Sequence, residues 1–351
     1  MVEATELFDL HRHLEASIPP LDIARAAQRF DIQALKKDGR TLNVSEISDL
    51  VVMQLGEKGW DPFYDTVVQA RKAFVSTDAI RYLTMAAFLQ AGTETKYFEM
   101  RVSPLSLIKD YLTNTGRKAE TETEYKLVAT EILNAMVEGM NMARQILPEH
   151  EFGLRFGISR TPRDNSFQKL DWLIDLFEQL NYKDNFTGLD VLGLEVEGDL
   201  KAVVPYIKRF RAYLPDLAIH AGESIGPKGI YDALELNPNA IGHGIAAAKD
   251  PMLMHELASR GIYIENCPTS NARVIPHILA EYEQHPLRTL TDYRDSDGKR
   301  IKIVLGTDDP VSFGLTIAQE HEAARALGAD IGYIKECARE RFHHIMDKRA
   351  A

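Results

Sequence analysis

Cysteine is scarce in this chain. Only Cys267 and Cys337 occur among 351 residues, which is too few for a disulfide framework in a protein of this length. Chains without such a framework are typical of reducing compartments. We therefore expect a cytoplasmic protein, by default and not because of a targeting signal.

Long apolar runs and basic runs are missing as well. No segment approaches the roughly 18 consecutive apolar residues of a membrane span, and residues 1–8 contain acids and no apolar signal-peptide core. The formal net charge is -11, without a run of basic residues, which argues against nucleic acid or an anionic membrane surface as a partner. A small, neutral or cationic substrate fits this charge better.

The hydrophobic content, 45%, is enough to bury a large core, and the length allows two or three ordinary domains or one α/β barrel. Short apolar runs of strand character recur at residues 7–10, 96–102, 152–158, 190–196, 217–220, 240–242, 262–265 and 301–305. Stretches of helical periodicity, such as 122–147 and 166–180, lie between them. This alternation predicts parallel βαβ units, and eight of them can close into a (β/α)₈ TIM barrel. Since no linker-like composition or repeat marks a boundary, we predict one domain over residues 1–351.

The connection between the first two predicted strands is longer than one helix requires. It covers residues 14–95 and contains several helical patterns and a loop at 56–62. In such barrels the loops that follow the strands build the active site. A helical insertion after the first strand is therefore predicted to act as a lid.

Polar residues gather where the predicted strands end, which is where a TIM barrel places its chemistry. They are His11 and His13 after the first strand, Gly198 and Asp199 after the fourth, residues 220–223 at the fifth, His243 after the sixth and residues 307–310 after the eighth. Glycines flank His243 and let other groups approach it closely, which suits a side chain that orients a bound water.

His11 and His13 are separated by one residue, so both side chains lie on one face of a strand and can bind one metal ion. The alternative is a pair of polar residues on the solvated face of an edge strand. The apolar run before them favours a buried strand, in which two imidazoles need a partner. His220, His243 and Asp308 are candidate partners, and zinc is the ion that this ligand chemistry suggests first.

Two later segments have both a chemical and a structural interpretation. In the run from His220 to Glu223, Gly222 allows a sharp turn that brings Glu223 beside the metal, whereas the alternative is an ordinary strand end with a solvated glutamate. Asp308 and Asp309 repel each other unless a cation lies close. They could also begin a helix in which Pro310 occupies the first turn.

Taken together, these segments resemble the adenosine deaminase family of the amidohydrolase superfamily over nearly the whole chain. The motifs are His11-Arg12-His13-Leu14-Glu15, Glu99-Met100-Arg101-Val102-Ser103-Pro104, His220-Ala221-Gly222-Glu223, Gly242-His243-Gly244, Cys267-Pro268-Thr269-Ser270-Asn271 and Thr307-Asp308-Asp309-Pro310. The resemblance implies one Zn²⁺ per chain and hydrolysis of adenosine to inosine and ammonia. Cys267 is then interpreted as a packing residue, since three imidazoles and one carboxylate suffice for zinc.

The same resemblance implies a role for each site residue. The zinc ligands would be His11, His13, His220 and Asp308, with His13 also beside the substrate, Glu223 would transfer the proton, and His243 would orient the water. Gly198 would contact the purine through its backbone, Asp309 would meet a ring nitrogen on the far edge, and Glu15 would face the sugar. A binuclear relative would carry a lysine at the end of the fourth strand, where this chain has none between Glu195 and Asp199.

Three positions depart from the family pattern beside the expected pocket. Glu15 stands where many members have aspartate, Ala16 replaces a usual glycine, and Glu197 precedes Gly198 where a small residue is common. The longer side chain of Glu15 could fill sugar space, as suits a free base, or reach the same hydroxyl by another rotamer. Adenine or another aminopurine nucleoside is therefore the alternative substrate, and a barrel relative that has lost catalysis is a further alternative.

Overall fold

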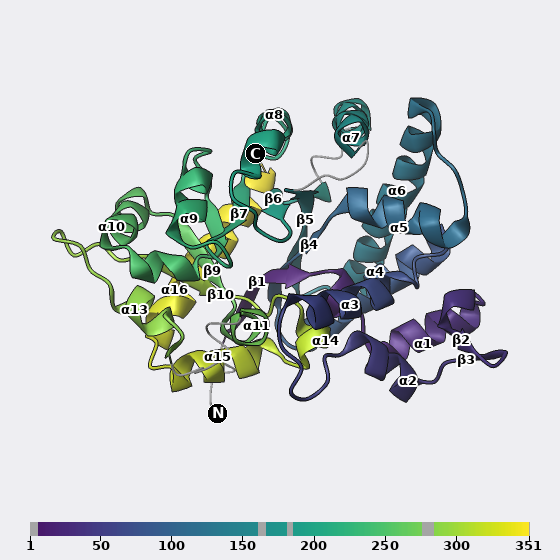
Figure 1. Ribbon diagram of the computed structural model, residues 1–351, viewed down its shortest axis with the longest axis horizontal. Coiled ribbons are helices and arrows are strands. Elements are labelled where there is room, and N and C mark those ends of the chain that lie inside the picture. Colours follow the sequence, from purple (N-terminus) through teal and green to yellow (C-terminus); the bar gives the residue numbers. More distant parts are fainter. Residues whose placement is uncertain (1–5, 161–165, 181–184, 276–283, 351) are drawn as a thin grey trace.

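The structure is a computed structural model, and it describes residues 6–160, 166–180, 185–275 and 284–350 (Figure 1). Eight strands form one sheet in the order β1-β4-β5-β6-β7-β8-β9-β10, and all paired neighbours are parallel. Their bounds are β1 Phe8–His13, β4 Tyr97–Val102, β5 Glu151–Ser159, β6 Leu189–Leu192, β7 Leu217–Ala221, β8 Ala240–His243, β9 Tyr263–Asn266 and β10 Lys302–Leu305.

The first and last strands meet, so the sheet closes. The Asp308 N–H donates to the His11 carbonyl over 2.7 Å, and the His13 N–H donates to the Asp308 carbonyl over 2.7 Å. A side chain at Gly306 would collide with the His11 backbone, since a Cβ there would lie 2.6 Å from its carbonyl oxygen. These contacts confirm the predicted (β/α)₈ barrel, and they place the ends of β1 and β10 side by side.

The fourth barrel strand is shorter than predicted. The apolar run suggested residues 190–196, but β6 ends at Leu192 because Gly193 adopts a φ of 102° that strand geometry does not allow. Residues 193–199 therefore form a loop, and Gly198 lies six residues beyond the strand end rather than next to it.

Helices cover the outside of the barrel (Figure 1). They are α4 Thr77–Gly92, α5 Pro104–Thr115, α6 Glu122–Ile146, α7 Ser166–Leu180, α8 Leu200–Phe210, α9 Pro227–Leu234, α10 Pro251–Arg260, α11 Pro268–Val274, α13 Leu287–Asp292, α14 Pro310–Phe313, α15 Ile317–Ala326 and α16 Ile331–Ala350. Thr121 and Glu124 form a capping box that begins α6. Within the described residues, none of the helices combines the length and the apolar character that crossing a bilayer requires.

The long connection after β1 contains two kinds of structure. Its last helix, α4, packs on the sheet as an ordinary crossover helix, with the ring of Phe88 5.9 Å from Phe98 and 5.0 Å from Phe152. The part before it comprises η1 Glu15–Ser17, α1 Pro20–Arg29, η2 Gln33–Leu35, β2 Lys36–Lys37, β3 Arg40–Thr41, α2 Val44–Val51 and α3 Trp60–Arg71. The loop predicted at 56–62 is shorter, because Gly59 precedes a helix that already includes Trp60 to Pro62.

The barrel interior contains many charged side chains. Arg101, Arg155, Asp190, Asp216 and Glu265 are all fully buried. Burial of a charge is costly unless it is paired, and each of these five is paired, with separations of 2.9 Å for Arg101 to Asp190 and 2.8 Å for Arg155 to Asp216. This layer lies directly beneath the residues of the site.

Candidate active site

The predicted site residues converge at the carboxyl ends of the strands. One cavity is lined by His13 and Glu15 from the end of β1, His220 and Glu223 from β7, His243 from β8, and Asp308 and Asp309 after β10. Its volume is about 650 Å³ with the open mouth included, which is the size of an ordinary small-molecule site. The structure thus brings together residues from four of the five predicted strand ends, and the pair Gly198 and Asp199 is not among the lining residues.

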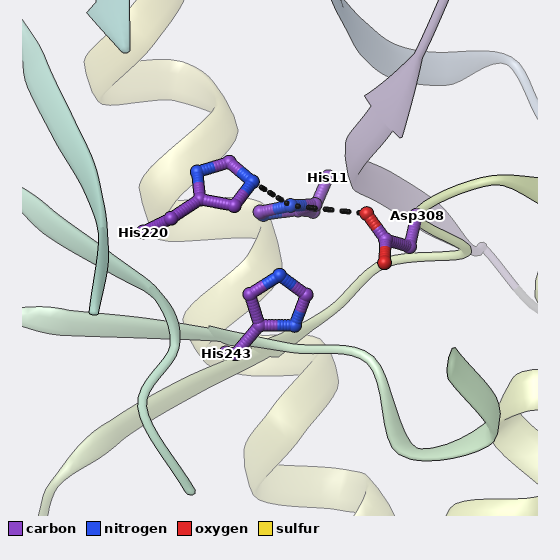
Figure 2. Close-up of side chains that lie close together, drawn as sticks. All are labelled: His11, His220, His243 and Asp308. Atoms are coloured by element: carbon purple, nitrogen blue, oxygen red, sulfur yellow. Dashed lines mark hydrogen bonds and ion pairs between the residues drawn. The ribbon is translucent and has the colours of Figure 1, made fainter. Parts of the chain in front are cut away.

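Four buried side chains form a group that could hold a metal ion. His11, His220, His243 and Asp308 each offer one ligand atom, and these atoms all lie within 4.8 Å of one another. Figure 2 shows the three imidazoles and the carboxylate facing a common centre. The Nε2 atom of His11 is 3.1 Å from Nε2 of His220 and 3.5 Å from Oδ1 of Asp308.

The outer hydrogen bonds of two histidines show why a cation fits this group. Nδ1 of His11 is 3.1 Å from Glu265, and Nδ1 of His220 is 3.2 Å from Asp190. Burial raises the pKa of each carboxyl, but the positive charge of Arg101 and the histidine partner outweigh it, so that both pKa values lie below the ordinary range.

An ionised carboxylate only accepts hydrogen bonds, so we infer that each Nδ1 carries the proton. Both Nε2 atoms then present lone pairs to each other across 3.1 Å, an arrangement that is repulsive without a cation between them. Burial also lowers the pKa of His220 to about 3, so its imidazole is neutral at pH 7, as a metal ligand must be.

His243 differs from these two histidines. Its Nδ1 is 3.1 Å from the side-chain amide nitrogen of Asn271, which can only donate. The proton of a neutral His243 therefore resides on Nε2, the atom that lies 3.7 Å from the Glu223 carboxylate. A protonated Nε2 is suited to donate a hydrogen bond to water or substrate and not to bind a metal.

His13 reaches the group from another side. Its Nε2 is 3.2 Å from Oδ1 of Asp308, and it forms a second potential ligand cluster with Asp308 and Asp309. Burial lowers the pKa of His13, but the neighbouring Asp309 and the hydrogen bond to Asp308 outweigh it and raise the pKa to about 9. Since His11 and His13 approach the same carboxylate oxygen, they share one face of β1.

The two aspartates after β10 have opposite electrostatic character. Burial raises the pKa of Asp308, but His243, His11 and His13 outweigh that effect and keep it well below the usual range. Burial and the charge of Asp308 together raise the pKa of Asp309 well above it. The raised pKa favours the protonated form of Asp309 over that of Asp308, and the lowered pKa of Asp308 makes it the carboxylate better suited to a metal.

Glu223 is placed on a turn that other buried groups hold. Glu195 accepts hydrogen bonds from the N–H groups of Gly222, Glu223 and Ser224, each over 2.8 Å. Burial, with Asp308 and Glu195 nearby, raises the pKa of Glu223 to about 7 even though His243 lowers it. Such a carboxyl exchanges its proton readily near neutral pH.

Backbone strain marks two of the site residues. His243 and Asp308 both adopt a φ of 61°, a left-handed conformation that is uncommon outside glycine and that gathers at functional sites. Ser270 donates to Asp308 over 2.6 Å and fixes that side chain.

One wall of the cavity was not predicted at the level of residues. It comes from α3, whose Trp60, Phe63, Tyr64, Val67 and Arg71 all line the cavity. Their spacing places them on one side of a helix, and this spacing is the signal that could have revealed the wall from the sequence.

Charged residues and a glycine complete the cavity. Arg71 donates to Glu15 over 3.1 Å and lies 3.6 Å from Asp110. Near β6, the lining residues are Leu192 and Gly193, and Gly198 is not among them.

Cys267 is fully buried, and burial raises the pKa of its thiol well above the ordinary value, in keeping with the packing role predicted for it.

A parallel eight-stranded barrel with histidines and an aspartate at the ends of β1, β7, β8 and β10 is the architecture of the amidohydrolase superfamily. Within it, the chain belongs to the adenosine deaminase family, because the family model described as adenosine deaminase matches residues 7–343. An adenosine deaminase from Erwinia tasmaniensis is 30% identical over 334 residues, which cover 93% of this chain and 89% of that protein. The protein is an adenosine deaminase-type aminohydrolase.

Solved structures share the fold at lower identity. Adenine deaminase from Arthrobacter aurescens is similar with a TM-score of 0.73 and 18% identity, covering 99% of this chain and 98% of that one. An amidohydrolase from Burkholderia ambifaria with bound Zn has a TM-score of 0.69 and 18% identity, with 98% and 92% covered. Arabidopsis ADAL, complexed with GMP, has a TM-score of 0.68 and 17% identity, with 98% and 96% covered. The names of these relatives include two different purine substrates or ligands, so the likeness fixes the fold and not the substrate.

Proposed function

We propose that the protein hydrolyses adenosine to inosine and ammonia with one zinc ion per chain. The single observation that carries this proposal is the position of Glu223, whose carboxylate lines the same cavity as the metal group and lies 3.7 Å from Nε2 of His243. Burial raises its pKa to about 7, which suits a group that gives and takes a proton. Family membership and the adenosine deaminase relatives support the same reaction. We propose the set His11, His13, His220 and Asp308 as the ligands. A neutral His243 carries its proton on Nε2 and is suited to donate a hydrogen bond, whereas His13, whose pKa is about 9, would release its proton on binding the metal.

The reaction replaces the amino group of the purine by oxygen. When bound, zinc lowers the pKa of a water molecule toward ~7 and so supplies a nucleophile at neutral pH. The water oxygen forms a bond to the ring carbon that bears the amine. One proton of the water reaches the adjacent ring nitrogen through Glu223 and the other reaches the amine, so that the carbon–nitrogen bond breaks, a carbon–oxygen double bond forms and ammonia leaves. Glu223 gives its proton to the adjacent ring nitrogen, and the N–H at Nε2 of His243 donates to the incoming oxygen.

Substrate orientation follows from the opposite side of the cavity. Asp309, which lines the cavity and whose pKa is raised by burial and by Asp308, contacts a ring nitrogen on the far edge of the purine. The aromatic wall of α3, which includes Trp60 and Phe63, covers the apolar surface of the base. We propose that the insertion within residues 14–95 acts as a lid on the site, and that residues 1–351 form one domain.

Adenine is the second candidate substrate, and one observation favours it. The carboxylate of Glu15 already has a buried partner in Arg71 at 3.1 Å, so it is not free to serve the sugar alone. If this ion pair fills the space that the sugar of a nucleoside would need, adenine fits the cavity and adenosine does not. We rank adenosine first because a carboxylate can accept from a sugar hydroxyl while it keeps one ion-pair partner.

A panel of purines distinguishes these substrates. Purified, zinc-loaded protein is mixed with adenosine, adenine or AMP, and ultraviolet absorbance and ammonia release are followed together. We expect the fastest turnover with adenosine. Turnover of adenine without any of adenosine would replace the nucleoside by the base, and no ammonia from any of the three would remove the deaminase proposal.

A further inference from the structure

Arg101, in a motif of β4 that the proposed reaction does not use, lies beneath the metal group. We propose that Arg101 is a positioning residue that sets the orientation of two metal-binding histidines at once, an inference that rests on the metal site of the proposed function. Its Nη1 donates to Asp190 over 2.9 Å, and its Nη2 donates to Glu265 over 2.9 Å. All three side chains are fully buried.

The same two carboxylates are the partners of the histidines. Glu265 uses Oε2 for both Arg101 and Nδ1 of His11, while Asp190 contacts Arg101 through Oδ2 and Nδ1 of His220 through Oδ1. The guanidinium of Arg101 is therefore connected to two imidazoles, to His11 through Glu265 and to His220 through Asp190. The two Nε2 atoms at the ends of these paths are the ones that meet 3.1 Å apart.

The geometry of arginine is what this arrangement requires. A guanidinium is planar and presents its donors in a fixed fork, whereas the ammonium of lysine is a single point charge. Arg101 is also anchored, because Nη2 donates to the Leu10 carbonyl over 2.7 Å, next to His11 in β1. A lysine would keep the positive charge but could not hold both carboxylates in their present planes.

Outer partners of this kind tune metal binding, since they fix the tautomer and the ring orientation of the ligands. Glu265 has additional support from Arg341 at 3.4 Å, whereas Asp190 contacts Arg101 at 2.9 Å and His220 at 3.2 Å. We therefore expect loss of the Arg101 guanidinium to change the orientation of His220 more than that of His11.

Arg155 offers a matched control. It is also a fully buried barrel arginine, and it donates to Glu99 over 2.8 Å and to Asp216 over 2.8 Å. Those carboxylates serve other partners, since Glu99 accepts from Thr187 and Asp216 accepts from Arg341. Arg155→Lys thus makes the same chemical change in the barrel interior. Arg155 does not hydrogen bond the carboxylates that hold His11 and His220, and it reaches Glu265 indirectly, through Asp216 and Arg341.

The test compares zinc binding by full-length wild type, Arg101→Lys and Arg155→Lys. Each is stripped of metal, and its zinc dissociation constant is measured by competition with a chelating dye. The absorption spectrum of the cobalt-substituted protein, which reports ligand geometry, is the second readout. We expect Arg101→Lys to weaken zinc binding by about 10–100-fold and to change the cobalt spectrum, with Arg155→Lys within about threefold of wild type.

Two results would overturn the proposal: unchanged zinc affinity in Arg101→Lys, or an equal loss in both variants. If Arg101→Lys cannot be purified folded, Arg101→Gln replaces it, because its single amide can reach only one of the two carboxylates. Turnover is not part of the readout. If the variants bind zinc as expected but the wild type deaminates no purine, the proposed function is wrong and this inference stands. If Arg101→Lys is active and binds zinc with normal affinity, this inference is wrong and the proposed function stands.

Discussion

The two halves of the cavity are built in different ways. The metal half consists of side chains at strand ends, such as His11, His220 and Asp308, which a closed hydrogen-bonded barrel fixes. The substrate half consists of α3 from the insertion, with Arg71 reaching back to Glu15. The first half is held by the scaffold and the second by side-chain contacts, so chemistry and substrate choice are expected to respond to different mutations.

In the metal half, we expect the largest loss of activity from a substitution that removes the ionisable carboxyl of Glu223. Glu223→Gln keeps the shape of the side chain but cannot transfer a proton, so we expect kcat/KM to fall by about 10²–10⁴-fold or more. Zinc content should stay at one per chain, since Glu223 is not among the proposed ligands. Stopped-flow absorbance and metal analysis on the same sample measure both quantities, and a variant as active as wild type would remove Glu223 from the mechanism.

A smaller loss is expected from the support of that residue. Glu195 accepts from Gly222 through Oε1 and from Glu223 and Ser224 through Oε2, so in Glu195→Gln an NH2 donor would face either the Gly222 N–H or the N–H groups of Glu223 and Ser224. The turn must shift, and a displacement of about 1 Å at a catalytic group costs on the order of 10²-fold. We expect kcat to fall by about that factor with little change in KM.

Asp199→Asn is the matched control for that variant. Asp199 lies in the same loop and accepts from the Val196 N–H over 2.8 Å, and not from the N–H groups of the turn that holds Glu223. It shares one neighbour with Glu195, since Arg160 lies 3.6 Å from Asp199 and 3.5 Å from Glu195. Steady-state kinetics should show wild-type kcat for Asp199→Asn. Equal losses of kcat in the two variants would show that the loop as a whole, and not the hydrogen bonds from the turn to Glu195, positions Glu223.

These contrasts also explain what the sequence could predict. The barrel and the metal group followed from local patterns, because short apolar strands end in polar residues and parallel strands bring those ends together. His11 and His13 needed only the two-residue period of a strand. His11, His220 and Asp308 belong both to the predicted ligand set and to the four-residue group of the structure, whereas the fourth member of that group is His243 and not the predicted His13.

Other features depended on contacts between distant residues. The end of β6 was placed too late, because the apolar run continued past Gly193, whose positive φ ends the strand. The pairing of Arg71 with Glu15 joins residues 56 positions apart, and no periodicity predicts it. The electrostatic difference between Asp308 and Asp309 likewise arises from burial and neighbours, which two adjacent aspartates do not reveal by themselves.

The substrate half is tested by Arg71→Met, which removes the ion pair with Glu15 but keeps an extended side chain. If Arg71 holds Glu15 for a sugar hydroxyl, KM for adenosine should rise about tenfold, the equivalent of one hydrogen bond to a charged group. KM for adenine, which lacks the sugar, should stay within about twofold.

Lys72→Met is the neighbouring control, since Lys72 bonds to Gln69 over 2.6 Å and does not line the cavity. It should leave both KM values unchanged. A rise in KM for adenine as large as that for adenosine would contradict a role of Glu15 at the sugar.

The last expected effect concerns the stability of the metal-free protein and not its catalysis. Burial raises the pKa of Glu223 from 4.5 to about 7, so between these values the folded state binds more protons than the unfolded state. The contribution of Glu223 to the free energy of unfolding is therefore lost as pH rises through this window. Glu223→Gln does not ionise, so the variant should become the more stable protein, by at most about 3 kcal/mol above pH 7. Urea unfolding with a chelator at pH 5 and pH 8 measures this difference, and a gap that stays constant between the two pH values would show that the fold does not raise the pKa of Glu223.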